Sequence, residues 1–297
     1  MIRNILLFAF LFDFLRISYS QENVFHDPVD IPMYLSGTFA ELRTNHFHSG
    51  IDIKTQGKEG LKIFAIENGY VSRIKVSPYG FGKAVYINHP NGLTSVYAHL
   101  KEFNIQLEQV VYEHQYQKHS FAVNIYPPKN QLKVGKGDVI GLSGNTGGSF
   151  GPHLHFEIRD TKTKEPLNPM NYEFEIKDNI APKIYRLAIY PLNYKSSVNG
   201  ENRKFIYSLL RKGSSYYVKN NDVISVSGNI GFGIETYDFL NNSHNKCGVY
   251  SIALFIDDYL IYAHKMDRFA FWETRYINSH IDYEEKNEYN RKIQKAY

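Results

Sequence analysis

Two histidines and one aspartate in the first half of the sequence are of the residue types that bind a metal ion. His48 and Asp52 lie four residues apart, and His155 follows much later in the chain. Neutral imidazoles and a carboxylate suit Zn²⁺, and three protein ligands leave a fourth coordination position for water. The residue types therefore predict a site for one Zn²⁺ per chain, with His48, Asp52 and His155 as ligands.

Residues 45–53 alternate between two faces, as a half-buried strand does. His48, Gly50 and Asp52 share one face, and the isoleucines share the other. A side chain at position 50 would occupy the place of the metal, so glycine is expected there. Four residues span roughly 13 Å along an extended strand. The strand must therefore bend or end between His48 and Asp52, which Gly50 permits.

Residues 151–158 show the same alternation. His153, His155 and Glu157 share one face, and the apolar residues between them share the opposite face, which can rest on a core. His153 lies too close to His155 to share the metal comfortably. Its imidazole could instead contact an attacking water or an oxyanion.

His99 is the fifth candidate, near the end of a strand predicted over residues 95–100. Val96 and Ala98 are expected on the core face of that strand, which leaves His99 on the polar face. Peptide hydrolysis requires a proton acceptor and a group that stabilises the oxyanion. We therefore predict that His99 and His153 are catalytic, and either could serve as base or as oxyanion partner.

A glycine-rich loop over residues 143–151 precedes the second histidine segment. The loop lacks the Lys-Ser/Thr pair of a phosphate-binding loop and leads into a strand, which excludes that function. We interpret its glycines as points of close backbone approach to an extended substrate. The residues predicted to bind substrate are Asn45, Gly144, Asn145, Thr146 and Gly147.

The other histidines receive no metal role. His46 could support the site from behind, and His89, in a predicted hairpin turn, is expected to face solvent. No paired ligand spacing is found at His114, His119, His244, His264 or His280. Cys247 is the single cysteine, so an internal disulfide is excluded; a packed, inert thiol is expected rather than a reactive one.

Length and composition allow one large domain or two modest ones, because the chain has 297 residues of which 43% are hydrophobic. The 24 tyrosines and 20 phenylalanines favour β structure. The net charge of +4 comes without a Lys/Arg cluster. The composition therefore argues against nucleic acid as a partner and allows only weak attraction to an acidic polymer.

Short strands separated by glycine-rich turns predict a mainly β protein. We expect an antiparallel β domain over residues 21–178, then an immunoglobulin-like β-sandwich over 179–281. A charged helical tail is predicted over residues 282–297, and its lack of a closing signal is expected of a fragment. Residues 101–131 interrupt the first domain with helical spacing and a short strand, either as a flap over the site or as a structural addition.

Residues 1–20 resemble a secretory signal peptide, with a positive tip, a short apolar run and small residues before the cleavage point. The run is too short to span a membrane, and an uncleaved anchor is the alternative. No cysteine follows the cleavage point, which argues against a lipoprotein. We therefore expect an exported protein, periplasmic or at the cell surface, without a stable membrane span after cleavage.

Four motifs in order carry a family resemblance: residues 48–52, 97–100, 141–147 and 151–157. Together they resemble the lysostaphin/LytM-type zinc endopeptidases, family twenty-three of the metallopeptidases, over about residues 45–168. The resemblance implies an antiparallel β fold of the duplicated-hybrid or barrel-sandwich type with an open groove. It also implies Zn²⁺ on the three ligands, the two catalytic histidines, and cleavage of peptide cross-bridges or stem peptides in peptidoglycan.

The chain departs from this family in two places. The insertion of residues 101–131 is longer than usual, and the region after residue 180 lies outside the resemblance. Some relatives have lost their ligands and activate other wall hydrolases, but all five site positions are present here. A non-catalytic wall-binding or hydrolase-regulating protein with a structural metal is the alternative. The C-terminal β domain is expected to be a positioning module or to bind a protein partner.

Overall fold

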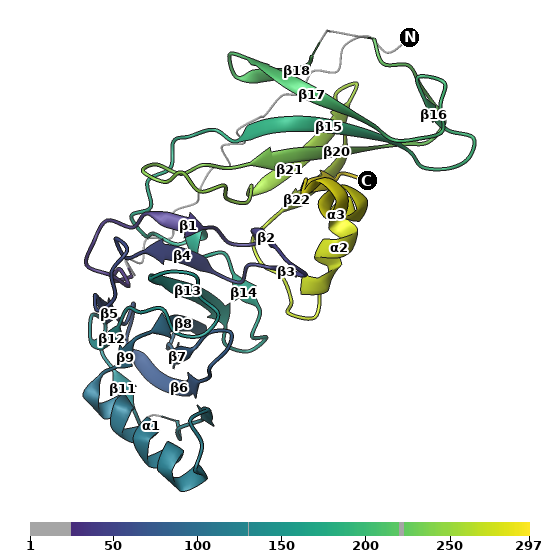
Figure 1. The fold of residues 1–297 in the computed structure, drawn as a ribbon. Helices are drawn as coiled ribbons and strands as arrows, with labels where there is room; N and C mark the ends of the chain where they lie inside the picture. Colours follow the sequence, from purple (N-terminus) through teal and green to yellow (C-terminus); the bar gives the residue numbers. More distant parts are fainter. Residues whose placement is uncertain (1–24, 130, 220–222) are drawn as a thin grey trace.

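The computed structural model describes residues 25–129, 131–219 and 223–297. The predicted signal peptide of residues 1–20 lies outside these ranges. Figure 1 shows two parts, and residues 25–178 are called the N-terminal part and residues 179–297 the C-terminal part. None of the helices in the described ranges has the length and apolar character needed to span a bilayer.

The N-terminal part is built on a nine-stranded sheet in which β13 (His153–Asp160) lies between β4 (Ile51–Lys54) and β8 (Leu93–Leu100). The other strands of this sheet are β1 (Leu35–Gly37), β6 (Gly69–Val76), β7 (Lys83–Asn88), β10 (Val123–Ile125), β11 (Lys133–Val134) and β14 (Pro166–Leu167). Their pairings are antiparallel. The predicted mainly antiparallel β fold is thus confirmed.

The main core lies between this sheet and a second sheet of β5 (Lys62–Phe64), β12 (Val139–Leu142) and β9 (Glu102–Phe103). Ile63 and Ile140 of the small sheet share one buried cluster with Tyr97 and Phe156 of the large sheet. Burial of such apolar side chains is the main favourable term in folding. Because one face of the large sheet is committed to this core, the side chains on its other face are available for a site.

The insertion of residues 101–131 forms α1 (Ile105–Lys118) and then β10. Asn104 caps the helix start by accepting a hydrogen bond from the Leu107 backbone, and the helix ends at His119 in the left-handed conformation. Leu107 and Val111 join the main core, while β10 pairs with β6 at the sheet edge. Figure 1 places α1 at the end of the molecule away from the C-terminal part, which favours a structural addition over a flap.

The C-terminal part contains a five-stranded antiparallel sheet with β15 (Lys183–Pro191) between β17 (Phe205–Lys212) and β20 (Ile230–Tyr237). Its outer strands are β18 (Ser215–Val218) and β23 (Ile293–Lys295). Two further pairs are β16 (Ser197–Val198) with β19 (Val226–Ser227) and β21 (Ser251–Ile256) with β22 (Tyr259–Lys265). The helical segments of this part are η2 (Thr274–Tyr276), α2 (Ile277–His280) and α3 (Tyr283–Tyr289), while η1 (Pro169–Asn171) lies near the end of the N-terminal part.

The predicted charged tail of residues 282–297 is wrong in its second half. α3 begins after Asp282, whose side chain caps it, and ends at Asn290. The chain then returns as β23 beside β20, with Ile293 fully buried. The sheet therefore takes a strand from beyond residue 281, so the predicted boundary is corrected. The immunoglobulin-like topology stays a prediction.

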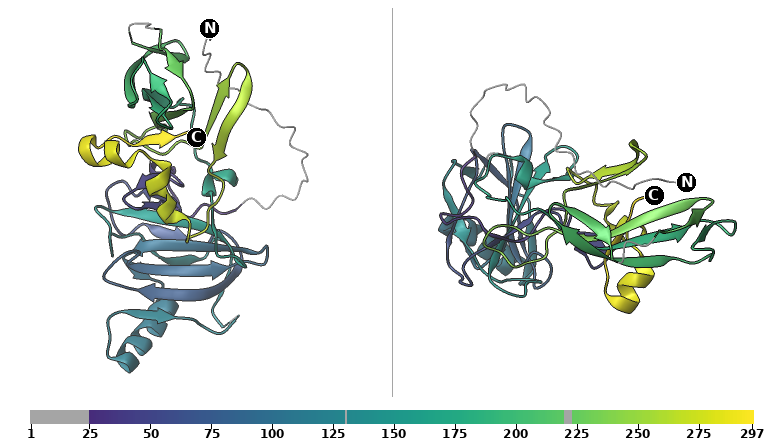
Figure 2. Two further views of the ribbon diagram at one scale, coloured as in Figure 1. Left: turned by 90° about the vertical axis from the view of Figure 1, so that its right-hand side faces the viewer. Right: turned by 90° about the horizontal axis from the view of Figure 1, so that it is seen from above.

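The two parts meet around the hairpin of β2 (Leu42–Arg43) and β3 (His46–Phe47), which lies beside the C-terminal helices (Figures 1 and 2). Leu42 packs with Ile277 and Ile281 in one buried cluster, and Phe47 rests against it. The hairpin directly precedes His48 in the chain. The junction is therefore adjacent to the first predicted ligand.

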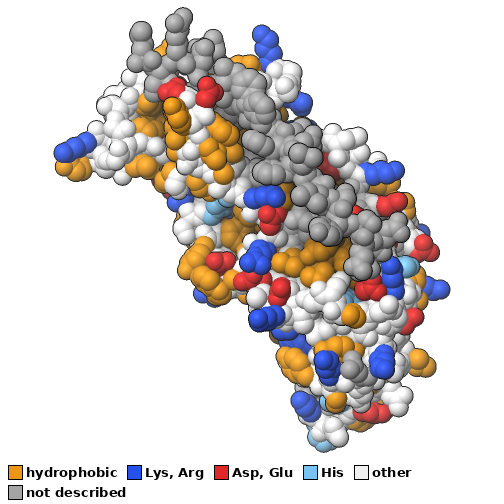
Figure 3. Space-filling model, turned by 180° about the vertical axis from the view of Figure 1, so that it is seen from behind, with side chains coloured by type: hydrophobic (Ala, Val, Ile, Leu, Met, Phe, Trp, Pro, Cys, Tyr) orange, Lys and Arg blue, Asp and Glu red, His pale blue; other side chains and the backbone are white. Residues whose placement is uncertain are grey.

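The charges of the molecule are mixed on the face seen from behind. There, Lys and Arg side chains are interspersed with Asp and Glu over the coloured surface (Figure 3). The coloured part of this face in Figure 3 therefore shows no large patch of one charge sign.

Candidate active site

The first two predicted ligands come from a break between two strands. β3 ends at Phe47 and β4 begins at Ile51. The chain turns between them, and the His48 Nε2 and Asp52 Oδ1 atoms are 3.1 Å apart. The prediction of one strand over residues 45–53 is wrong, while the expectation that the strand bends or ends between these ligands is confirmed.

Gly50 is required by packing rather than by the metal. A Cβ atom at this position would lie 2.3 Å from the Phe156 carbonyl oxygen and 2.8 Å from Glu157 Cγ. The prediction that a side chain here would take the place of the metal is therefore wrong. Glycine instead allows the segment after His48 to lie directly against β13.

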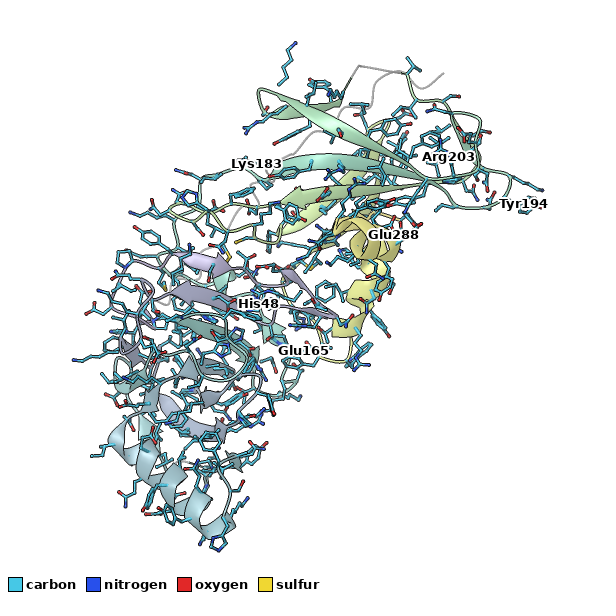
Figure 4. The ribbon with its side chains drawn as sticks, in the orientation of Figure 1. His48, Glu165, Lys183, Tyr194, Arg203 and Glu288 are labelled. Atoms are coloured by element: carbon cyan, nitrogen blue, oxygen red, sulfur yellow. The ribbon has the colours of Figure 1, made fainter. Side chains whose placement is uncertain are left out.

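The third predicted ligand comes from β13, where His155 lies opposite Asp52 in the antiparallel pair. The His155 Nδ1 atom is 3.0 Å from Asp52 Oδ1 and 3.0 Å from His48 Nε2. All three side chains are buried, and their ligand atoms lie within 4.8 Å of one another. Figure 4 labels His48, which marks the position of this cluster in the N-terminal part.

Hydrogen bonds on the outer nitrogens decide which nitrogens face the cluster. His48 Nδ1 donates to the Thr38 carbonyl at 2.8 Å, and His155 Nε2 donates to Glu157 Oε1 at 2.9 Å. When neutral, each ring thus presents an unprotonated nitrogen toward Asp52. Two lone pairs and a carboxylate oxygen this close favour a positive charge between them, either a proton or a metal ion. Ligands of a tetrahedral Zn²⁺ lie roughly 3.3 Å apart, so the spacing fits such an ion.

The electrostatics of the cluster also favour a cation. Burial opposes ionisation of Asp52, but the charge of His48 and hydrogen bonds from neighbouring histidines hold its pKa well below the usual value. Burial would lower the pKa of His155, yet Asp52 and Glu157 raise it to about 9. Burial would raise the pKa of Glu157, while Arg159 and His155 lower it to about 2. His155 is therefore held between two ionised carboxylates.

His99 reaches the site through a β-bulge in β8. Two residues, Ala98 and His99, oppose Ala84 alone on β7, and His99 has a φ of 59°. Val96 and Ala98 lie in the small cluster on the site side, whereas Tyr97 is in the main core. The predicted core face is thus wrong for Val96 and Ala98, while Leu100 does lie in the main core as predicted. Regular alternation would send His99 into the core, and the left-handed bulge turns it back.

The two predicted catalytic histidines lie side by side, with ring centroids 4.7 Å apart. His99 Nδ1 donates to the Thr146 carbonyl and His153 Nδ1 donates to the Gly151 carbonyl, both at 2.8 Å. The Nε2 atom of each ring is left as an acceptor, and that of His153 is 3.5 Å from Asp52 Oδ1. Burial lowers the pKa of His99 to about 4, so this ring is neutral at pH 7.

Comparison with known proteins agrees with this geometry. The model of peptidase family M23 matches residues 46–117 and 110–169. The matched region, residues 46–169, is similar to this family and is called the M23 domain. The DD-carboxypeptidase/endopeptidase Mpg of Neisseria meningitidis serogroup B is 33% identical over 130 residues, which cover 44% of this chain and 24% of Mpg. The peptidoglycan DD-endopeptidase ShyA of Vibrio cholerae is 27% identical over 162 residues, which cover 52% of this chain and 31% of ShyA. The chain thus spans about a quarter to a third of the length of these curated relatives.

Solved structures similar to this chain include a zinc-containing peptidase from Vibrio cholerae, with 26% identity and a TM-score of 0.36. The aligned region covers 48% of this chain and 38% of that one. The catalytic domain of lysostaphin from Staphylococcus simulans has 21% identity and a TM-score of 0.33, covering 47% of this chain and 90% of that one.

The glycines of the loop before β13 allow the M23 domain to pack against its own backbone. A Cβ atom at Gly144 would lie 2.4 Å from the Lys101 nitrogen. At Gly147, where φ is 75°, it would lie 2.3 Å from the Gly82 nitrogen. Packing thus gives a second reason for these glycines, and substrate binding by Gly144, Thr146 and Gly147 stays a prediction. The loop holds the site together, since Thr146 accepts the hydrogen bond from His99.

Asn145 and Asn45 stay predictions as substrate-binding residues. The Oδ1 atom of Asn145 is buried and has no hydrogen-bond partner among the described residues. A buried acceptor without a partner is costly unless a ligand completes it. Asn45 is exposed in the turn between β2 and β3, with a φ of 61°.

Two other histidines and the single cysteine lie outside the ligand cluster. His89 is buried and hydrogen-bonds to the Asn68 carbonyl and to Ser95, so the prediction that it faces solvent is wrong. His46 is exposed and bonds to the Thr44 carbonyl, away from the ligand cluster. Cys247 is fully buried, and this burial raises the pKa of its thiol to about 12, which confirms a packed, inert cysteine.

Sequence reasoning placed Glu157 on the face of His155 without giving it a role, and it missed Arg159 and Arg43. Arg159, one step further along the alternation, contacts Glu157 Oε2 at 2.5 Å and could have been found by extending the strand. Arg43 binds Asp52 Oδ2 at 2.8 Å from β2, which is too short to give a periodic signal.

Proposed function

We propose that this chain is an exported zinc endopeptidase that hydrolyses stem peptides or peptide cross-bridges of peptidoglycan. The observation that carries the proposal is the convergence of His48, Asp52 and His155 beside two further histidines whose Nδ1 atoms donate to backbone carbonyls. The names of the relatives Mpg and ShyA support the peptidase chemistry, and that of ShyA supports peptidoglycan as substrate. Export rests on the predicted signal peptide of residues 1–20.

The three ligands would hold one Zn²⁺, which supplies a Lewis acid that polarises a carbonyl group and acidifies water. In their neutral forms, His99 and His153 each offer an Nε2 acceptor, because a carbonyl oxygen engages each Nδ1–H. One of the two accepts the proton of the attacking water and passes it to the leaving amine. The other, when protonated, donates to the oxyanion of the tetrahedral intermediate.

The Nδ1 hydrogen bonds also orient the two rings and stabilise their charged forms. When His99 takes a proton on Nε2, the Thr146 carbonyl faces the positive ring at 2.8 Å. Asn145, between Gly144 and Thr146 on the same loop, would accept a hydrogen bond from a substrate N–H at its unpartnered Oδ1. The loop thereby links substrate binding to the position of the base.

The proposal is tested by digesting purified peptidoglycan with the full chain and analysing the released fragments by mass spectrometry. We expect about one zinc per chain, loss of cleavage on chelation, and loss of both zinc and cleavage in His155→Ala. His99→Ala and His153→Ala should retain zinc and lose at least about 100-fold in activity.

His46→Ala is the matched control, because His46 is exposed near the first ligand and lies outside the cluster. We expect this variant to match the wild type. Cleavage that survives both chelation and His155→Ala would contradict the proposal. Binding to peptidoglycan without cleavage would favour the non-catalytic alternative.

A further inference from the structure

The ligand cluster is supported by polar groups that in turn touch the C-terminal part of the chain. Three separate contact paths begin at His48, Asp52 and His155, and each leads across the junction between the two parts. They meet the C-terminal part at different positions, which no single loop contains. Each contact path runs from the ligand outward to the C-terminal part.

The contact path from His48 passes through Thr38. The Thr38 carbonyl accepts the hydrogen bond from His48 Nδ1, and the Thr38 hydroxyl is fixed by Gly248. That hydroxyl accepts from the Gly248 N–H at 3.0 Å and donates to the Gly248 carbonyl at 3.3 Å. The backbone N–H of Phe47, next to His48, donates to Thr274 Oγ1 at 2.9 Å. Both sides of His48 are thus tied to the C-terminal part.

The contact path from Asp52 passes through Arg43. Asp52 Oδ1 faces the ligand cluster, and Oδ2 accepts from Arg43 at 2.8 Å. Arg43 Nε also lies 3.2 Å from Glu41 Oε1. Between these two residues, the Leu42 carbonyl accepts a hydrogen bond from Lys292 of the C-terminal part. The segment that orients the Asp52 carboxylate is therefore anchored from outside the M23 domain.

The contact path from His155 passes through two charged residues. His155 Nε2 donates to Glu157 Oε1 at 2.9 Å, and Arg159 Nε contacts Glu157 Oε2 at 2.5 Å. The guanidinium of Arg159 lies 4.6 Å from the ring centroid of Phe271, a cation–π distance. Arg159 is half-buried, and its guanidinium also lies 5.5 Å from the ring centroid of Tyr86. Phe271 thus limits where Glu157 can hold His155.

We propose that the C-terminal part positions the metal ligands of the M23 domain, with Phe271 and Gly248 as its principal positioning contacts. Partners behind metal ligands typically change metal affinity 10–100-fold, because they set the orientation and basicity of the ligand. The C-terminal part would therefore determine how tightly the site holds zinc. This inference rests on the proposed zinc site.

The test measures the Zn²⁺ dissociation constant of the full chain by competition with a chelator, at a temperature where every variant is folded. Phe271→Ala removes the ring beside Arg159 and should weaken zinc binding about tenfold. Phe271→Tyr retains the ring and should bind as the wild type does. Trp272→Ala is the matched control, since the neighbouring Trp272 is 71% exposed and its ring pairs with Tyr276.

A second pair of variants tests the contact path from His48 independently. Thr38→Val removes the hydroxyl that binds Gly248 but leaves the carbonyl that binds His48, and should also weaken zinc binding about tenfold. Thr38→Ser restores the hydroxyl and should restore affinity. Because the two contact paths end on different ligands, the fold-losses of zinc affinity in Phe271→Ala and Thr38→Val should multiply in the double variant.

The outcomes separate positioning from a merely structural role. Unchanged zinc affinity in both Phe271→Ala and Thr38→Val, even with lower melting temperatures, would overturn the inference. An equal loss in Trp272→Ala would overturn it for Phe271. If the wild type binds zinc but cleaves no peptidoglycan, the proposed function fails while this inference is still decided by the variants. If the wild type binds no zinc, both fail.

Discussion

His155 lies between two carboxylates, and the outer one, Glu157, is fully buried. Its negative charge is neutralised by Arg159 and shared with His155. Glu157→Gln would keep the size of the side chain but remove the charge that makes His155 a basic ligand. We expect zinc affinity to fall by about 10–100-fold, as measured by chelator competition.

Glu165→Gln is a suitable comparison for that variant. Glu165 is half-exposed, lies 3.6 Å from Arg268, and is labelled in Figure 4 near the junction. An exposed pair of this kind contributes little, so its zinc affinity should match the wild type. Equal affinities in both variants would show that the Glu157 charge has no influence on the metal.

At the residue scale, regular alternation located His155 and Glu157 correctly because β13 is an uninterrupted strand. The same reasoning failed for His99. Its position depends on a bulge against β7 and a left-handed φ, which a period of two cannot reveal. Gly50 was recognised as necessary for the wrong reason, because its close neighbour is the backbone of a strand far along the chain.

The β22 strand contains a histidine whose protonation should weaken the fold. Burial, aided by His280 nearby, lowers the pKa of His264 from 6.5 to about 4. Above pH 6.5 the ring is neutral in both folded and unfolded chains, so its full contribution to stability is present. Between pH 6.5 and 4 only the unfolded chain takes up the proton, and the free energy of unfolding falls as pH falls.

The size of this loss is on the order of 1 kcal/mol, since the ring is only half-buried and solvent screens the full shift. Urea denaturation at pH 7 and pH 4.5 measures it against the variant His264→Phe. That variant keeps a ring against Tyr262 and His280 but cannot titrate. Its stability should decline less over this pH range, and an identical decline would refute the assignment to His264.

The α1 helix should contribute to stability through its buried face. Leu107→Ala removes a side chain that is 2% exposed in the main core, so we expect a loss of about 2–5 kcal/mol in the free energy of unfolding. Ile105→Ala, in the same helix at 89% exposure, should change stability by less than about 0.5 kcal/mol. Denaturant titrations of the two variants make the comparison, and similar losses would contradict the packing.

At the element scale, helical spacing within residues 101–131 indicated the helix α1, and short strands with turns indicated the β structure after residue 179. β23 was missed because it has three residues, and the charged α3 directly before it resembles a solvated tail. Its place beside β20 is set by burial of Ile293 against Ala188 and Tyr190. A pairing between such distant segments gives no local signal.

The two parts of the molecule should respond together to metal removal. Ligand binding to the folded state alone adds about 4 kcal/mol when free zinc exceeds its dissociation constant by about a thousandfold. The ligands converge only in the folded M23 domain, and the Leu42 cluster and the Thr38 hydrogen bonds join that domain to the C-terminal part. Loss of zinc should therefore destabilise regions remote from the site.

Trp272 allows a direct measurement, because it is the single tryptophan of the chain and lies in the C-terminal part. Chelation should shift the denaturation midpoint seen by Trp272 fluorescence by the same amount as that seen by far-ultraviolet circular dichroism. His155→Ala should show no zinc-dependent shift with either probe. If chelation moves the circular dichroism transition but leaves the fluorescence transition in place, the two parts unfold independently, and the junction does not couple the C-terminal part to the metal.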